Sequence, residues 1–356
     1  MKNSIVMATL AIILSVSAPL PSVTAEAVAR ESITVMVSPL MVGFTKAIND
    51  NLGMRYGLPP LTITPALAGP AVKAFCSGIG EKTPDVIGLP RQLSKREYNH
   101  CIENGVIDII ELAVGMDALI LVVRKDEPVF NLTPRAMYFA LAAEIPQADD
   151  FIPNTVQRWK QIDNRLPDRE IYIVGSENGT SINAFFKEIF MEGGCRGLRQ
   201  FKSYYSAEDR VKTCTTLRDD GRFIGIKPPI ALNFKDVFLK SPPGAIAVIP
   251  YTVYSHNTDW LSAMPVLNVM PTPAVIKSDQ YEAVSPVRFY VKRRHMEHRL
   301  GGDGIVRGLY DFIEEAMSEN AIGPGGYLET LGMVIDNDAD RGEDRDQAMR
   351  LQPYRR

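Results

Sequence analysis

The sequence predicts an α/β protein of two domains built around largely parallel sheets. The first reason is the alternation of short, β-branched apolar runs with amphipathic segments, which is typical of βαβ units. The second is length, because 356 residues exceed the usual size of one domain. The third is composition: 46% hydrophobic and 23% charged residues are ordinary for a globular chain with a sizeable core. A disordered, collagenous or small disulfide-scaffold protein is therefore excluded.

The first third of the chain shows the alternation most clearly. Apolar runs predict strands, and the segments between them have apolar residues at helical spacing. Ser94 and Glu97 have the spacing of a capping box, which predicts that a helix begins there. The expected strands are Ile33–Val37, Leu61–Thr64, Val86–Gly88, Asp108–Leu112 and Ala118–Val123, and the expected helices are Val42–Leu52, Val72–Gly78 and Ser94–Asn104.

The alternation continues through the rest of the chain. Thr133 and Pro134 predict another helix start. Residues 336–356 mix acidic and basic side chains with almost no apolar anchors, so this segment is predicted to be a disordered tail. The other expected elements are strands Ile171–Val174, Ala245–Ile249 and Val287–Val291 and helices Ser181–Met191 and Gly304–Glu319.

The N-terminus has the pattern of a secretory signal peptide. Lys2 precedes the apolar run Ile5–Val16, and small residues follow around Ala25 and Ala27. We assign residues 1–25 to the signal peptide, with cleavage after Ala25 or Ala27. The run is too short to span a bilayer comfortably, and no cysteine near the cleavage site offers a point for lipid attachment. A freely diffusing periplasmic protein is expected, with an uncleaved N-terminal anchor as the alternative.

Charge and motifs exclude several functions. Lys plus Arg number 39 against 42 Asp plus Glu, so no global basic field exists to bind a nucleic acid. The sequence contains no Walker A loop, no GxGxxG after a strand, no GxSxG and no HExxH. An enzyme is therefore not expected, and no cofactor or metal is predicted. Isolated carboxylates such as Asp117 and Asp163 are weak support for catalysis, and Asp117 is better explained as ordering a strand that crosses between domains.

Four cysteines, all after the signal peptide, predict disulfides in an oxidising compartment. Four cysteines allow three connectivities. The local one, Cys76 with Cys101 and Cys195 with Cys214, closes the two shortest loops. A zinc site is the competing interpretation, but no pair has metal-ligand spacing such as CxxC.

Two strand-to-helix turns are candidate anion sites. The segment Val174–Phe185 passes from a strand through a loop rich in Gly and hydroxyl side chains into a helix. Backbone N–H groups at such a helix start favour an anion. The alternative is a simple N-cap, in which Thr180 or Ser181 only satisfies the first helical turn. A similar turn occurs at Met36–Leu40, and two such helix ends facing one cleft would form a ligand site.

Histidine is scarce, and His295 and His298 are the only close pair. They flank Glu297 at a spacing that allows both imidazoles on one helical face, which is a weak indication of a metal site. The surrounding segment is dense in charge and follows a predicted strand. An exposed, solvated connection explains it as well.

Seven segments between about Ile33 and Leu331 match a known family in their order and spacing. They are Lys73–Gly78, Thr83–Val86, Arg91 with Ser94–Glu97, Cys101–Val106, Asn178–Phe185, Met191–Cys195 and Gly323–Leu328. In these segments the chain resembles the substrate-binding proteins of ABC phosphate transporters. The resemblance implies a two-domain type II periplasmic binding protein fold, with central mixed sheets and a double-stranded hinge. It also implies the local disulfide pairing, because cysteines lie in similar places in one branch of the family.

The ligand loops depart from the family pattern. The first loop, usually Gly-Ser-Ser-Thr, is Val37–Leu40, and only Ser38 keeps a hydroxyl. The usual Gly-Thr-Gly-Gly-Gly is Leu67–Ala71, and Ile182 takes the place of an arginine when the second-domain helix is aligned in register. A dehydrated phosphate needs many converging donors, so these losses disfavour tight binding of inorganic phosphate. The alternative is a shift of a residue or two, with Arg91 and backbone N–H groups still holding an oxyanion.

These observations predict a solute-binding component of an ABC importer. It would close over a small ligand, phosphate or another oxyanion, and deliver it to a permease in the inner membrane without changing it chemically. The alternative is a degenerate binding fold with an interaction role in the periplasm or a more apolar ligand. Domain one is expected at residues 32–114 plus 285–335, and domain two at 115–284. The expected ligand residues are Ser38, Pro39, Leu40, Gly69 and Arg91 from domain one and Asn178, Gly179, Thr180 and Ser181 from domain two.

Overall fold

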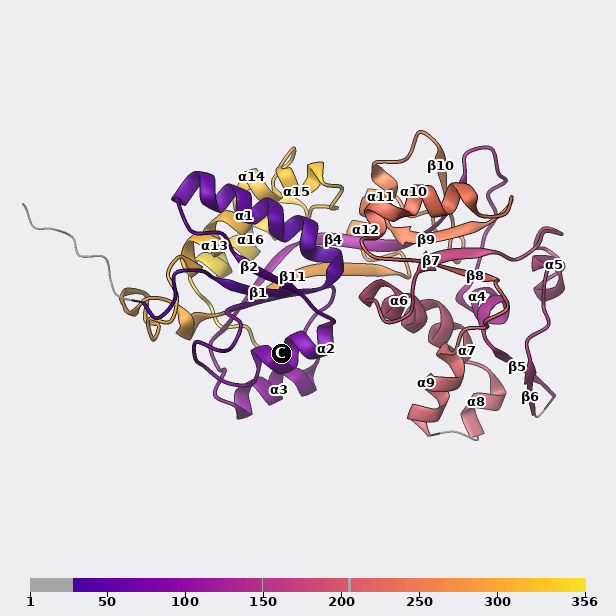
Figure 1. Cartoon of the computed structure of the whole chain (residues 1–356), viewed down its shortest axis with the longest axis horizontal. Helices are drawn as coiled ribbons and strands as arrows, with labels where there is room; N and C mark the ends of the chain where they lie inside the picture. The colour runs from indigo at the N-terminus through magenta and orange to yellow at the C-terminus, as the bar shows by residue number, and fades with distance from the viewer. Residues whose placement is uncertain (1–27, 149, 204–205) are drawn as a thin grey trace, which may run out of the picture.

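A computed structural model describes residues 28–148, 150–203 and 206–356. The predicted signal peptide lies outside the described residues. Two lobes of strands and helices lie side by side, and the long strands β4 (Ile109–Arg124) and β11 (Val284–Lys292) run between them (Figure 1). Among the described residues, every helix is too short or too polar to span a bilayer.

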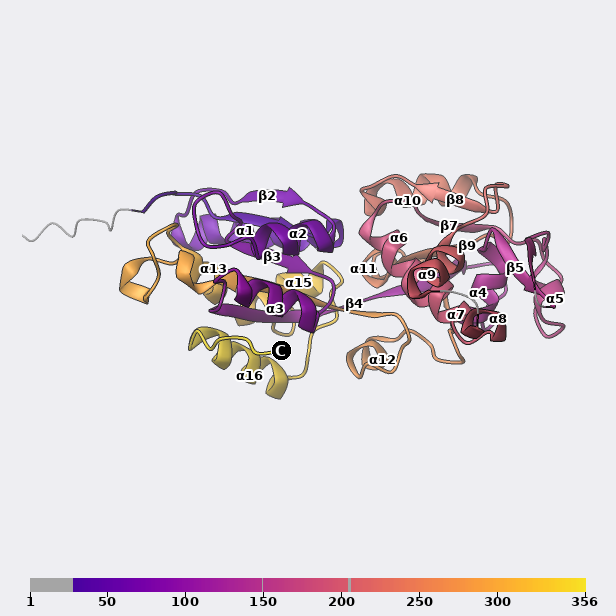
Figure 2. The same cartoon turned by 90° about the horizontal axis from the view of Figure 1, so that it is seen from below.

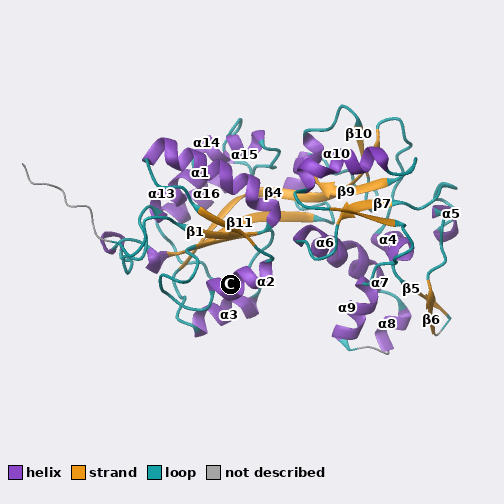
Figure 3. Ribbon diagram, in the orientation of Figure 1, coloured by secondary structure: helices purple, strands orange, loops and turns teal. Residues whose placement is uncertain are grey.

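The first lobe contains a mixed sheet with helices on both faces (Figure 3). Strands β1, β2 and β3 are parallel, because helices connect them, and β11 returns antiparallel between β3 and β4. The strand order is β2 (Thr62–Pro65), β1 (Thr34–Val37), β3 (Val86–Leu89), β11 (Val284–Lys292) and β4 (Ile109–Arg124). One face packs on α1 (Val42–Tyr56), α13 (Leu309–Ala316), α14 (Glu319–Ile322) and α15 (Tyr327–Thr330), and the other on α2 (Ala68–Phe75) and α3 (Lys95–Glu103).

The second lobe continues the same sheet from the distal half of β4. The order is β4, β9 (Ile246–Pro250), β7 (Ile173–Ser176) and β8 (Phe223–Ile226), and β10 (Leu261–Met264) pairs with β4 on the other side. Strands β7, β8 and β9 are parallel. A separate hairpin consists of β5 (Glu144–Gln147) and β6 (Asp150–Pro153). The helices are α4 (Pro134–Leu141), α5 (Trp159–Ile162), α6 (Ser181–Phe186), α7 (Gly193–Cys195), α8 (Arg199–Ser203), α9 (Ala207–Thr215), α10 (Ile230–Lys240), α11 (Tyr251–Ser255) and α12 (Pro273–Lys277), and a π-helical segment, Lys187–Glu192, continues α6.

Strand β4 is continuous where the sequence predicted two strands, Asp108–Leu112 and Ala118–Val123. The predicted gap contains Gly115, which has a φ of 148° and lies where the register with β11 shifts next to Val287. A Cβ at this glycine would lie 2.6 Å from the Sδ of Met333. A bulge therefore replaces the predicted break, and both lobes share one strand. The domain boundaries at 114/115 and 284/285 remain a prediction.

Residues 336–356 are ordered, which differs from the disordered tail that their composition predicts. They form α16 (Asp338–Met349) and an extended end. The ring of Tyr354 packs edge-on against those of Tyr98 and Tyr290, with centroids 5.7 and 5.4 Å apart. The ring of Tyr354 and the apolar side chains of Ala348, Met349 and Leu351 thus fix a segment whose other residues are mainly charged. Seen from below, α16 and α12 lie along one side of the molecule and β2 and β8 along the other (Figure 2).

Both disulfides have the local pairing. Cys76 bonds to Cys101 and joins the end of α2 to α3, and Cys195 bonds to Cys214 and joins α7 to α9. All four sulfurs are therefore engaged, which leaves no thiolate for the zinc site considered as the competing interpretation.

Candidate functional site

The turn after β1 holds Ser38 against backbone groups of the first lobe. Its backbone N–H donates to the carbonyl of Gly88 at 3.0 Å, and its carbonyl accepts from the N–H of Met41 at 2.8 Å. Its hydroxyl is buried and has no hydrogen-bond partner in the part of the chain that the structure describes. Pro39–Met41 forms a 3-10 turn that leads into α1, and Leu40 packs against the hydrophobic cluster of the second lobe.

Gly69 lies inside a helix rather than in a loop. It is the second residue of α2, which begins four residues earlier than the sequence predicted, and it is exposed. Leu67 precedes the helix and provides no side-chain cap. A Cβ atom added to Gly69 would have no atom within 4 Å, so packing does not require glycine at this position.

Arg91 is engaged by a carboxylate on its own lobe. Its two terminal nitrogens donate to the two carboxylate oxygens of Glu97, both at 2.8 Å. Glu97 also accepts from the backbone N–H of Ser94 at 2.9 Å, which completes the predicted capping box of α3. Although burial raises the pKa of Glu97, the hydrogen bonds from Arg91 and Ser94 outweigh it and lower that pKa to about 2. The carboxylate is thus ionised and neutralises the guanidinium.

The helix start in the second lobe is a simple N-cap. The Thr180 hydroxyl accepts from the N–H of Asn183 at 3.1 Å and donates to the carbonyl of Glu177 at 3.0 Å. It also lies 2.8 Å from the hydroxyl of Ser176. Asn178 and Gly179 are exposed in the turn, and Ser181 is the first residue of α6. The hydroxyl of Thr180 therefore satisfies local backbone groups.

The base of the boundary between the lobes is apolar. Leu40 from the first lobe and Ile182, Phe185 and Pro250 from the second surround a cavity of only about 10 Å³. Asp117 lies at the edge of this cavity and accepts from the Thr252 backbone N–H and hydroxyl at 3.1 and 3.0 Å. Burial raises the pKa of Asp117 to about 6. This base has room for no ligand, and Asp117 joins β4 to α11.

A larger cavity of about 470 Å³, which we call the interlobe pocket, opens beside this base. It adjoins the start of α1 in the first lobe. In the second lobe it lies at the carboxyl ends of β7, β8 and β9, where ligands bind in open α/β sheets. The first lobe contributes Pro39, Leu40, Val42, Gly43, Phe44, Lys46 and Leu331, and the second contributes Ser176, Thr180, Ile182, Pro228, Pro229, Ile230, Ala231, Leu232, Pro250, Thr252, Val253, His256 and Asn257.

The two histidines considered as metal ligands make separate contacts. His295 is fully buried, so the prediction of an exposed connection was wrong there. Its Nδ1 lies 2.6 Å from a carboxylate oxygen of Asp85, and its Nε2 accepts from the N–H of Gly80 at 3.2 Å. Burial lowers the pKa of His295, so we assign the neutral imidazole with the proton on Nδ1. His298 is exposed, and its Nδ1 lies 3.0 Å from the carbonyl of Gly302.

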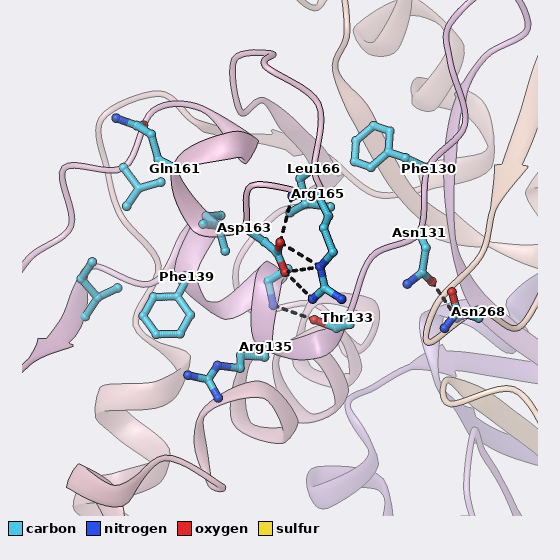
Figure 4. Close-up of a pocket in the computed structure, with 14 residues that line it drawn as sticks. Phe130, Asn131, Thr133, Arg135, Phe139, Gln161, Asp163, Arg165, Leu166 and Asn268 are labelled. Atoms are coloured by element: carbon cyan, nitrogen blue, oxygen red, sulfur yellow. Dashed lines mark hydrogen bonds and ion pairs between the residues drawn. The ribbon is translucent and has the colours of Figure 1, made fainter.

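A further pocket of about 650 Å³ lies at the outer end of the second lobe, beside α4 and α5 (Figure 4). Arg135 stacks over the ring of Phe139 at 5.6 Å, and Arg165 forms an ion pair with Asp163 at 2.6 Å. Hydrogen bonds from Arg165 lower the pKa of Asp163 to about 2. Asp163 is therefore the ionised partner of an exposed pair, which is unsuited to act as a catalytic acid at neutral pH.

A family model described as a PBP superfamily domain matches residues 22–320. The chain belongs to this family. Protein SphX from Synechococcus elongatus is 24% identical over 304 residues, which cover 83% of this chain and 77% of that protein. A possible phosphate binding protein from Planctomyces limnophilus superposes with a TM-score of 0.64 at 19% identity, over 90% of this chain and 98% of the other. An ABC-type phosphate transport receptor from Vibrio cholerae gives 0.58 at 13% identity, over 85% and 100%.

Membership of the PBP superfamily confirms the predicted two-domain fold. The structure brings Pro39, Leu40 and Thr180 to the interlobe pocket, whereas Ser38, Gly69, Arg91, Asn178 and Gly179 do not line it. Sequence reasoning did not find the contributions of α10 and α11. Ile230, Phe234 and Phe238 follow Pro228–Pro229 at spacings of four, which is the signal that predicts helix α10.

Proposed function

We propose that this protein is the solute-binding component of an ABC importer in the periplasm. It captures a small ligand between its two lobes and presents the closed form to a permease in the inner membrane. The observation that carries the proposal is the interlobe pocket, because side chains of both lobes line it. A ligand that contacts both lobes favours their closed arrangement by its differential affinity.

The candidate ligands are oxyanions, phosphate among them. Structural relatives of the chain are described as a possible phosphate binding protein and as an ABC-type phosphate transport receptor, which supports this class of ligand. The contacts in this chain support inorganic phosphate less well. Arg91 already binds Glu97, and the hydroxyl of Thr180 already caps α6. The protein acts as a receptor, so the ligand leaves it chemically unchanged.

Mass spectrometry of the natively purified mature protein tests the proposal directly. We expect a small molecule in one-to-one stoichiometry, and a thermal-shift screen of phosphate, other oxyanions and small organic molecules should include compounds that raise the Tm. If no small molecule is retained and no member of the panel shifts the Tm, the receptor function is rejected.

The second candidate is an accessory protein whose ligand site is vestigial. The apolar base formed by Leu40, Ile182 and Phe185 favours it, because a dry contact between lobes also suits a protein without a ligand. Affinity purification from the source cells separates the two functions. A stable protein partner without a permease subunit favours the accessory role, and recovery of a permease favours the importer.

A further inference from the structure

The lining of the interlobe pocket is largely apolar. Leu40 and Phe44 from the first lobe face Ile182, Ile230 and Val253 from the second. The volume of about 470 Å³ is within the range of small-molecule sites, roughly 300–1,000 Å³. Inorganic phosphate would fill little of this space and would lose its hydration against hydrocarbon, which is costly without many donors.

The polar groups of the lining are mostly engaged in local hydrogen bonds. The Thr252 hydroxyl donates to Asp117, and the Thr180 hydroxyl donates to Glu177. Both ring nitrogens of His256 lie 3.0 Å from backbone carbonyl oxygens, those of Thr252 and Thr330. These groups therefore do not form the ring of donors that a multiply charged oxyanion requires.

The described lining of the interlobe pocket carries a positive charge and no acidic side chain. Lys46 projects from α1, is exposed, and has no ion-pair or hydrogen-bond partner among the residues that the structure describes. The described lining includes no Asp or Glu. A single unpaired ammonium beside a wide apolar wall is complementary to a ligand with one anionic head group and a hydrocarbon body.

We propose that the interlobe pocket binds a small organic anion, with its apolar body between the lobes and its head group toward Lys46, in preference to inorganic phosphate. This inference rests on the receptor function proposed above and specifies the class of solute. Carboxylates and phosphonates share this chemistry. The apolar body contacts both lobes, so the same burial that gives affinity also favours closure.

Two glycines on α1 provide a matched pair of variants. Gly43 lines the pocket, and a Cβ added to it would meet no atom within 4 Å. Gly53 lies on the same helix outside the pocket and also has no atom within 4 Å of an added Cβ. Gly43→Leu therefore adds a bulky side chain at the pocket wall, where its Cβ has space, and Gly53→Leu makes the same chemical change outside the pocket. Lys46→Gln removes the charge, and Lys82→Gln, at an exposed site of the same lobe, is its control.

Isothermal titration calorimetry of the mature protein with phenylphosphonate, benzoate and inorganic phosphate tests the inference. We expect at least one of the two aromatic anions to bind at least tenfold more tightly than phosphate, and the tighter one reports the preferred head group. Gly43→Leu should weaken that binding at least tenfold and Lys46→Gln about fivefold, whereas Gly53→Leu and Lys82→Gln should stay within twofold of the wild type. Circular dichroism melts establish that all variants fold.

Three outcomes overturn the inference. The first is phosphate binding as tight as that of the aromatic anions, and the second is equal affinity in Gly43→Leu and Gly53→Leu. Either leaves the receptor function standing, because a ligand is still bound. The third is no binding of any of the three probes. The receptor function is then judged separately by mass spectrometry of the purified protein, which does not depend on these probes.

Discussion

The ion pair between Arg91 and Glu97 provides a test of whether Arg91 binds a ligand or stabilises α3. The side chains are 39% and 22% exposed, and the pair is bidentate. Partial exposure screens the interaction, whereas the two-point geometry strengthens it, so we expect a coupling free energy of about 1–2 kcal/mol. Glu97→Gln is the suitable partner variant, because the glutamine oxygen can still accept the capping-box hydrogen bond from Ser94, whereas the charge and one of the two acceptors for Arg91 are lost.

Urea unfolding of Arg91→Ala, Glu97→Gln and the double variant at pH 7 measures this coupling. The pair also predicts a pH dependence. Because the pKa of Glu97 falls from its ordinary value of 4.5 to about 2 in the folded state, the contribution of the pair is present above pH 4.5. It is lost as the pH falls from 4.5 to about 2. A coupling below about 0.3 kcal/mol would show that the pair does not stabilise the fold.

Anion binding to the same variants distinguishes the two roles. If the pair is structural, Arg91→Ala and Glu97→Gln both leave the anion affinity within about threefold of the wild type, and this is the result that we expect from the contacts. If Arg91 binds the ligand, Arg91→Ala weakens the anion more than tenfold, and Glu97→Gln, which releases the guanidinium, strengthens it. The second pattern would refute the structural assignment.

Three further predictions concern stability. Burial lowers the pKa of Lys292 from its ordinary value of 10.5 to about 7 in the folded state. Between these two pH values the unfolded state therefore binds more protons than the folded state. The free energy of unfolding should rise by about 2 kcal/mol from pH 7 to pH 9. Lys292→Met should remove this rise and Lys82→Met should keep it; equal slopes in chemical unfolding would contradict the assignment. The two disulfides join cysteines separated by 25 and 19 residues. Replacing either cysteine pair by serine should lower the free energy of unfolding by about 3 kcal/mol and lower the Tm in calorimetry. An unchanged Tm would contradict this prediction. Deleting residues 336–356 should lower the free energy of unfolding by about 2–3 kcal/mol, because the ring of Tyr354 and the apolar contacts of α16 are lost; a disordered tail would give no change in the same measurement.

Sequence patterns predicted the fold well where local chemistry determines structure. The capping box at Ser94 lies at the start of α3, and the alternation of strands and helices gave the parallel strands of both lobes. The errors arose where distant residues decide the outcome. The sequence predicted a break between two strands around Gly115. Met333, far along the chain, packs closely against this glycine, and the chain forms a bulge within one continuous strand instead. The tail is fixed by Tyr354, whose partners Tyr98 and Tyr290 come from distant segments.

The candidate site was predictable only in part, for a similar reason. Both strand-to-helix turns occur where the sequence placed them, yet the hydrogen bonds of their side chains depend on neighbours that no spacing reveals. Glu97 was identified as a helix cap, but its second role as the partner of Arg91 required the three-dimensional arrangement. Lys46 gave no signal at all, because a lysine on the polar face of a helix is ordinary.

The apolar residues at the base of the boundary between the lobes also affect how strongly the two lobes associate. Leu40 of the first lobe packs against the hydrophobic cluster of the second, which includes Ile182. Each square ångström of apolar surface buried there stabilises closure by about 25 cal/mol, independently of any solute. A solute that binds the closed form then has less of the closure free energy to supply, so its apparent affinity approaches its intrinsic affinity for the closed state. An apolar base therefore suits a ligand that makes few polar contacts, and replacing Leu40 or Ile182 by a polar residue should weaken binding by disfavouring closure.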